Sequence, residues 1–183
     1  EVPHLPLPFV DVFCERGAFD LAQSRRILET ARDVGFPLKI HADEFENLGG
    51  AALAAALGAV SADHLVKTSP KDIKALAGSE TVAVSLPGTP FGLNEAEFTP
   101  AKALIEADVL IALATDINPG TSWCESMQFM LALACRKMGL SPQQAIAAAT
   151  INAAAALRLQ NRIGSIEPGK QADLLILNVN NFR

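Results

Sequence analysis

Short apolar segments alternate with helical segments over the first 116 residues of this chain. The apolar segments predict strands at 9–14, 37–42, 62–65, 81–87 and 108–116. These segments lack polar alternation, and each predicted strand returns to the next through a helix. The pattern therefore predicts an α/β fold, in which a parallel sheet is built from right-handed β/α crossovers.

The intervening helices are predicted at 20–35, 49–59, 69–78 and 99–107. Two of them begin with Ser-Pro or Thr-Pro, pairs typical of the first turn of a helix. After Asp116 the alternation stops, and the sequence predicts successive helices at 122–139, 141–150 and 151–159, then a strand at 173–179. The segment 86–93, "LPGTPFGL", reads as a loop that shapes a pocket wall or as a plain connector.

Composition excludes several classes of protein. The 183 residues carry a net charge of −5 with dispersed Lys and Arg, which argues against nucleic-acid binding. No apolar run reaches the ~20 residues of a membrane span, and the first residues lack the pattern of a signal peptide. The three cysteines have no CxxC spacing, which favours reduced thiols and a cytoplasmic location.

Polar residues gather where three predicted strands end. His41 with Glu44, His64, and Asp116 each follow an apolar strand. The carboxyl ends of parallel strands share one edge of a sheet, where α/β enzymes build their active sites. Taken singly, each residue is more often a helix cap, a turn residue or a buried core histidine. The only other histidine, His4, lies in a Pro-rich lead-in and has no predicted role.

Imidazole and carboxylate together are typical of a hydrolytic site that holds a zinc- or iron-type ion. His41 is predicted as a ligand, Asp116 as a ligand or base, and Glu44 as the group that moves a proton. Two ligands are too few, so further ligands are expected from outside this sequence.

The segment Asn118–Thr121 predicts an anion site. Its sequence "NPGT" runs from a strand end into an expected helix start, where free backbone N–H groups favour a negative charge. Gly120 allows close approach, and Thr121 or Ser122 is expected to cap the helix. A Pro-Gly turn with a cap is the simpler alternative.

The motifs "KIHADEF", "SADHL", "LPGTPFGL", "DINPGTS" and "GSIEPGKQADLLIL" resemble the metal-dependent amidohydrolase superfamily and, within it, the imidazolonepropionase family. The resemblance implies a (β/α)8 barrel with a small composite β-sandwich and one divalent ion, zinc or iron. It implies metal ligation by His41 and Asp116 and catalytic roles for Glu44, His64 and Asp116. The substrate-binding residues that it implies are Glu44, His64, Asn118, Gly120 and Thr121.

The same resemblance implies hydrolysis of the cyclic amide of 4-imidazolone-5-propanoate to N-formimidoyl-L-glutamate, a step of histidine degradation. The family's His-x-His pair is absent, so we expect the C-terminal part of a barrel, inactive when isolated. Residues 1–160 would form the partial barrel with its C-terminal helices, and 161–183 a strand segment of the sandwich. The expected partner is a small carboxylate-bearing substrate, with neither nucleic acid nor membrane, and the full-length enzyme could form a homodimer.

Two alternatives stay open. A deaminase of guanine or cytosine type would share the pattern of His41, Glu44, His64 and Asp116. A non-catalytic α/β domain would use the same residues only as caps.

Overall fold

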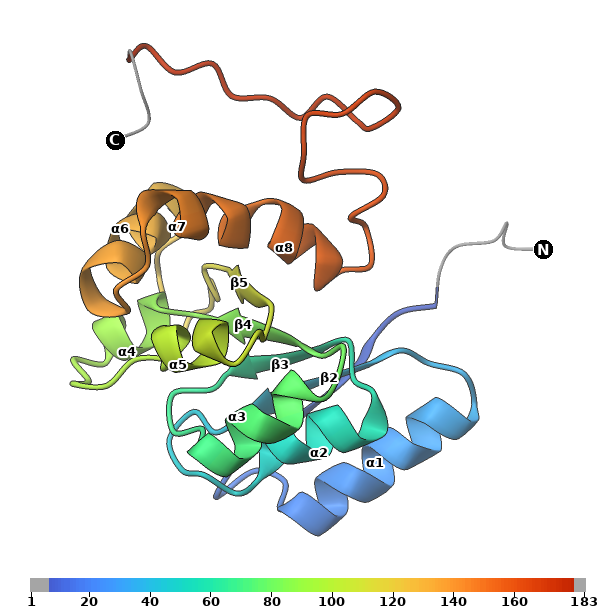
Figure 1. The fold of residues 1–183 in the computed structure, drawn as a ribbon. Helices are drawn as coiled ribbons and strands as arrows, with labels where there is room; N and C mark the ends of the chain where they lie inside the picture. The colour runs from blue at the N-terminus through green and yellow to red at the C-terminus, as the bar shows by residue number, and fades with distance from the viewer. Residues whose placement is uncertain (1–6, 180–183) are drawn as a thin grey trace.

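The computed structural model describes residues 7–179 and contains one five-stranded sheet (Figure 1). Its strands are β1 (Val10–Cys14), β2 (Leu38–Ala42), β3 (Ser61–His64), β4 (Val82–Ser85) and β5 (Ile111–Leu113). All neighbouring pairs are parallel, and the order in the sheet is the order in the chain. The predicted parallel β/α arrangement is confirmed, whereas His4 lies outside the described residues.

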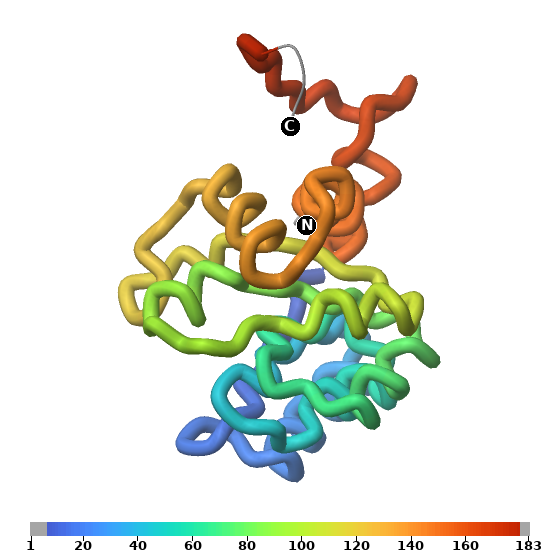
Figure 2. The backbone as a smooth tube through the Cα atoms, turned by 60° about the vertical axis from the view of Figure 1, so that its left-hand side comes forward, coloured from blue at the N-terminus to red at the C-terminus, as the bar shows by residue number. Residues whose placement is uncertain are grey.

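The helices form layers on both sides of this sheet. The bounds are α1 (Leu21–Asp33), α2 (Gly50–Leu57), α3 (Pro70–Ala77), α4 (Gly88–Gly92), α5 (Ala101–Glu106), α6 (Met127–Lys137), α7 (Pro142–Ala149) and α8 (Ile151–Ala155). Helices α1, α2 and α3 cover one face, and α6 and α7 join the same buried core at the β5 end of the sheet, whereas α8 packs on the opposite face (Figures 1 and 2). None of the helices described in residues 7–179 is long and apolar enough to cross a membrane.

Local side-chain chemistry sets several helix starts. Asp20, Ser69 and Ser141 each cap a helix through a capping box, in which the cap and the third helical residue satisfy each other's backbone N–H. The prediction that Thr99 begins a helix in the same way is wrong. Pro100 occupies the cap position of α5, and the Thr99 hydroxyl instead donates to the backbone oxygen of His64 at 2.7 Å.

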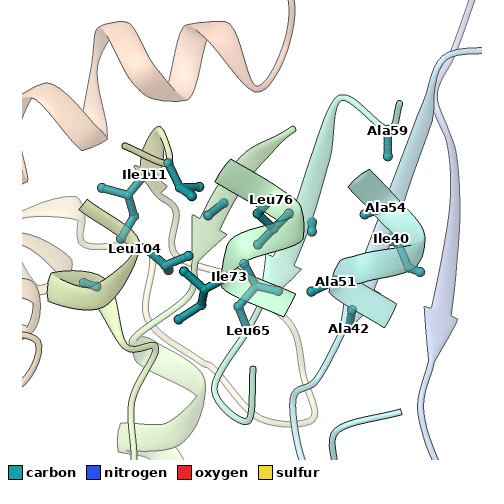
Figure 3. Packing of buried hydrophobic residues seen from close by; sticks show 14 of the residues in the cluster. Ile40, Ala42, Ala51, Ala54, Ala59, Leu65, Ile73, Leu76, Leu104 and Ile111 are labelled. Atoms are coloured by element: carbon teal, nitrogen blue, oxygen red, sulfur yellow. The ribbon is translucent and has the colours of Figure 1, made fainter. Parts of the chain in front are cut away.

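The main core lies between the sheet and its helices (Figure 3). Leu28, Ile40 and Leu104 are completely buried there. Helix α2 approaches the sheet closely because Gly50 has no side chain: a Cβ added there would lie 2.7 Å from the Cβ of Ala42. Such close packing fixes the position of the loop between β2 and α2.

The opposite face of the sheet is polar on its first two strands. Asp11, Lys39 and His41 point to this face, whereas Leu38 and Ile40 point into the core. Both faces of β3, β4 and β5 are buried, as the sequence predicted. In β1 and β2, by contrast, buried residues alternate with partly exposed ones, so the prediction is wrong there. Helix α8 covers part of the same face through a small cluster that consists of Val82, Val84, Leu86, Ala112 and Ala156, with alanines of α8 beside it.

Two predicted elements are shorter than expected. Strand β5 ends at Leu113 and α6 begins only at Met127, so residues 114–126 form an irregular segment that carries Asp116. The predicted loop 86–93 contains the short helix α4.

The predicted strand 173–179 is absent. Residues 172–177 form neither helix nor strand, and the side chain of Ile176 is 98% exposed. A strand requires a neighbour that satisfies its backbone groups, and no strand of the described chain lies beside this segment. Its assignment with 161–183 to a separate sandwich remains a prediction, and residues 180–183 lie outside the described part.

Candidate metal centre

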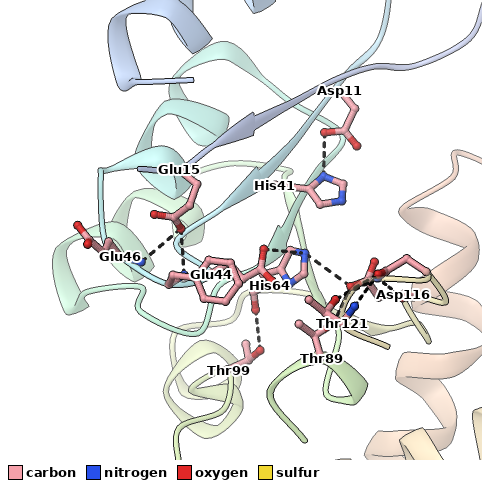
Figure 4. A network of polar contacts seen from close by, with 12 residues as sticks. Asp11, Glu15, His41, Glu44, Glu46, His64, Thr89, Thr99, Asp116 and Thr121 are labelled. Atoms are coloured by element: carbon pink, nitrogen blue, oxygen red, sulfur yellow. Dashed lines mark hydrogen bonds and ion pairs between the residues drawn. The ribbon is translucent and has the colours of Figure 1, made fainter. Parts of the chain in front are cut away.

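Three predicted site residues converge at one edge of the sheet (Figure 4). His41, His64 and Asp116 each offer one ligand atom, and these atoms all lie within 4.8 Å of one another. They come from the ends of β2 and β3 and from the segment after β5, so the parallel topology brings them together. Their chemical roles remain predictions.

His41 is oriented by a carboxylate that the sequence prediction missed. Its Nδ1 atom lies 3.0 Å from Oδ1 of Asp11, and this hydrogen bond is the main cause that raises the pKa of His41. The bond fixes the ring and leaves Nε2 as the nitrogen for a metal. The available signal was the single polar residue within the apolar run "FVDVFC".

His64 reaches the site through an unusual backbone conformation. It follows Asp63, which pairs with His41, so strict alternation would turn its side chain toward the helices. Its φ of 76° ends the strand and places Nε2 3.5 Å from Oε2 of Glu44 and 3.9 Å from Oδ2 of Asp116. Burial lowers its pKa to about 4, so the ring is neutral near pH 7.

Left-handed conformations recur at this edge. Asp43, His64, Leu65 and Asp116 all have positive φ values of 51° to 76°. Residues other than glycine rarely adopt a positive φ. In proteins, the backbone strain that this conformation causes is concentrated at functional sites. Asp43, His64 and Leu65 end or follow the strands that carry His41 and His64, and Asp116 lies in the segment after β5.

Glu44 has the electrostatics of a group that moves protons. Its side chain is only 8% exposed, and burial, followed by repulsion from Asp116, raises its pKa to about 7. A carboxyl group with that pKa can both accept and release a proton near neutral pH.

Asp116 has its own orienting partner. The hydroxyl of Thr89, in α4, donates to Oδ2 of Asp116 at 2.6 Å. Thr89 is buried, and the sequence placed its segment only in a pocket wall. A hydrogen bond to a carboxylate is among the stronger ones in proteins, so Thr89 fixes the carboxylate plane.

The basis of the predicted anion site at Asn118–Thr121 is wrong. No helix starts there: Ser126 caps α6 instead, and Ser122 Oγ donates to the backbone oxygen of Thr115. The backbone N–H groups of Gly120 and Thr121 both donate to Oδ1 of Asn118 at 2.8 Å. They are therefore engaged within the turn and are not free for an anion.

An open cavity of about 330 Å³ joins these residues. Its lining consists of Phe13, His41, Glu44, Phe45, His64, Asp116, Asn118 and Thr121. Its volume is that of a small-molecule site. Gly120 is the one predicted substrate residue outside this lining, and the two phenylalanines add aromatic walls that the prediction missed.

The donor set fits a zinc- or iron-type ion. His41 and Asp116 supply an imidazole and a carboxylate, the usual ligands of such ions, and their ligand atoms lie within 4.8 Å of each other. A second cluster, Asp11 with His41 and Asp63, fits less well. There Asp63 accepts from Ser61 Oγ, which in turn accepts from Lys39, so an ammonium group supplies the nearby positive charge.

Sequence comparison agrees with this chemistry. The profile of the Amidohydrolase family matches residues 15–182. The chain is 59% identical over 169 residues to an imidazolonepropionase from Herpetosiphon aurantiacus, which covers 92% of this chain and 40% of the relative. A similar protein from Symbiobacterium thermophilum is 52% identical over 93% of the chain and 40% of its own length. The chain thus spans 40% of the length of these curated relatives.

Solved structures share the fold. An adenosine deaminase from Xanthomonas campestris with bound zinc superposes with a TM-score of 0.70 and 26% identity, over 90% of this chain and 42% of that chain. A 5-methylcytosine deaminase from Klebsiella pneumoniae gives a TM-score of 0.77 at 18% identity, over 94% and 50%. The sheet corresponds to part of the barrel that the sequence predicted. The chain belongs to the amidohydrolase family.

Proposed function

We propose that this chain is part of an imidazolonepropionase, which hydrolyses the cyclic amide C–N bond of 4-imidazolone-5-propanoate to give N-formimidoyl-L-glutamate. The observation that carries the proposal is the 59% identity to a protein of that name over 92% of the chain. The polar cavity at the sheet edge supports it, because His41, Glu44, His64 and Asp116 all line that cavity.

His41 and Asp116 are the proposed metal ligands of this chain. A zinc- or iron-type ion bound there would lower the pKa of water towards ~7 and polarise the ring carbonyl. The amidohydrolase resemblance adds a His-x-His pair, which residues 1–183 do not contain. Each proposed ligand has an orienting partner: Asp11 is hydrogen-bonded to His41, and Thr89 donates to Asp116.

Glu44 is the proposed proton carrier. The oxygen of a water attacks the ring carbonyl carbon, and Glu44 takes a proton from that water. Glu44 then passes the proton to the ring nitrogen as the C–N bond breaks, so the nitrogen leaves as a neutral group. The pKa of about 7 suits both transfers.

His64 is proposed to hold the substrate carbonyl. Because burial keeps its imidazole neutral, one ring N–H can donate to the carbonyl oxygen without adding a full charge. Its Nε2 atom lies 3.5 Å from Oε2 of Glu44, and this short distance supports the proposal that both groups act on the same substrate carbonyl.

The propionate group of the substrate is proposed to contact Asn118, Gly120 and Thr121. Asn118 and Thr121 line the cavity, and their side chains offer an amide N–H and a hydroxyl. The Asn118 amide donates to the backbone oxygen of Asp116 at 2.8 Å and to Oγ1 of Thr121 at 3.1 Å, so a contact with the propionate would have to replace one of these bonds. A cytoplasmic location agrees with the three free cysteines, and a homodimer remains a prediction.

The test is turnover by the full-length protein that carries this chain. Imidazolonepropionate loss and formimidoyl-glutamate formation should both require a metal, so a chelator abolishes them and zinc or iron restores them. Release of ammonia from guanine, cytosine or adenine, without turnover of imidazolonepropionate, would establish a deaminase instead.

A further inference from the structure

Glu15 is a buried carboxylate that no catalytic step above uses. It directly follows β1, is 2% exposed, and lies beside the loop between β2 and α2 that carries Glu44 (Figure 4). A buried carboxylate requires compensating donors, because burial alone strongly disfavours its charge.

The donors that Glu15 finds are backbone amides. Its Oε2 accepts from the N–H of Phe45 at 2.9 Å and from that of Glu46 at 3.3 Å, and its Oε1 accepts from Arg16 N–H at 2.9 Å. Phe45 and Glu46 are the two residues directly after Glu44. Glu15 therefore holds the chain immediately beyond the proposed proton carrier.

A second polar cluster holds the other parts of the same loop. Oδ2 of Asp43 accepts from the Thr68 hydroxyl at 3.0 Å. The side-chain amide of Asn47 donates to the backbone oxygen of Lys67 at 3.1 Å and to Asp72 at 2.8 Å. These contacts attach the loop to the start of α3, so Glu44 lies between two anchored points.

Other roles of Glu15 agree less well with its surroundings. Both its oxygens are engaged by amides, and neither candidate metal cluster found among the described residues contains it. The neighbouring Arg16 pairs with Glu46 at 2.6 Å. Removal of the carboxylate would leave three backbone amides without their acceptor.

We propose that Glu15 is a positioning residue that fixes the backbone after Glu44 and thereby keeps the Glu44 carboxylate beside His64. The kinetic part of this role rests on the proposed function, whereas the ordering of the loop does not. A carboxylate directly after β1 thus positions the proton carrier on the next β/α loop.

The test compares Glu15→Ala, Glu15→Gln and the matched control Glu29→Ala in the full-length protein. Glu29 is a partly exposed glutamate on α1 that pairs with Arg25 and does not line the cavity. Glu15→Ala should lower kcat about 100-fold with bound metal unchanged, because a misplaced catalytic group costs about that factor. Glu15→Gln keeps an oxygen acceptor for Phe45 and Glu46 and should stay within about 5-fold of wild type.

Hydrogen exchange gives a readout that needs no activity. The amides of Phe45 and Glu46 should exchange at least about tenfold faster in Glu15→Ala, while those of α1 stay unchanged. If Glu15→Ala does not fold, Glu15→Asp replaces it, since its carboxylate is one methylene shorter and should give the same two effects.

The outcomes separate the two proposals. Faster exchange in a protein that does not hydrolyse imidazolonepropionate would reject the proposed function and support the loop anchor. Wild-type kcat in Glu15→Ala of an active enzyme, or lost kcat with unchanged exchange, would overturn the positioning role.

Discussion

The Nδ1 atom of His41 lies 3.0 Å from Oδ1 of Asp11, and the ring donates its hydrogen to that carboxylate. The two residues come from adjacent strands, β1 and β2, on the polar face of the sheet. Because this bond defines which ring nitrogen carries the hydrogen, it also makes the other nitrogen the metal-binding one.

Asp11→Ala should therefore weaken metal binding by about 10- to 100-fold, the usual effect of losing such a partner. Competition with a chromogenic chelator measures the affinity in the full-length protein. Asp33→Asn, an exposed change on α1, serves as the control. Unchanged affinity in Asp11→Ala would mean that the pair is only a partly exposed hydrogen bond without an orienting role.

Thr89→Val should also weaken metal binding, by about tenfold, since it removes the 2.6 Å donor to Asp116 without a large change in volume. Thr89→Ser retains the hydroxyl and should bind metal as wild type does. The same chelator assay compares both variants, and equal affinities would exclude an orienting role for Thr89.

Asp116→Asn should abolish turnover and leave the fold intact. Asn keeps the shape and the contact with Thr89 but lacks the charge that binds a cation. Turnover and far-ultraviolet circular dichroism provide the two measurements. Near-normal kcat would leave Asp116 as a turn residue only.

Glu44→Gln should lower kcat by about 10²- to 10⁴-fold and spare bound metal. Loss of metal would instead make Glu44 a ligand.

In the metal-free protein, burial raises the pKa of Glu44 from 4.5 to about 7.

The folded state then binds a proton that the unfolded state releases, so this group makes stability fall as pH rises from about 4.5 to about 7. The effect is at most about 3 kcal/mol. Chemical unfolding of wild type and Glu44→Gln across this range measures it, and parallel pH dependences would contradict the raised pKa.

Residues 1–183 expressed alone should bind metal poorly, lack turnover and self-associate. Among residues 7–179 at most three ligand atoms cluster at this site, and the tail exposes Leu174, Leu175 and Ile176. Metal analysis, size-exclusion chromatography and the hydrolysis assay test this directly. A monomer with stoichiometric metal and activity would show that these residues suffice.

The sequence predicted the parallel sheet and the clustering of His41, His64 and Asp116, because apolar runs mark buried strands and parallel strands end together. It missed Asp11 and Thr89, since their role depends on a partner in another element. A single polar residue in a strand carries little signal of what it faces.

The turn at Asn118 shows a different limit. Its sequence is compatible with a helix start and with a closed turn. The structure has the turn, because Oδ1 of Asn118 accepts from the N–H groups of Gly120 and Thr121 and so occupies donors that a helix start would leave free. The strand 173–179 fails for a third reason, because a strand depends on a neighbour that its own residues do not encode.

The left-handed backbone at Leu65 sets a limit on how this protein can be stabilised. Leu65 is fully buried with a φ of 62°, and a side chain in that conformation costs about 1 kcal/mol or more. Glycine would relieve this strain, but it would also remove a fully buried leucine side chain from the core, and such a truncation costs about 2–5 kcal/mol. The packing of Leu65 therefore outweighs its backbone strain and holds the strand end that turns His64 toward Glu44.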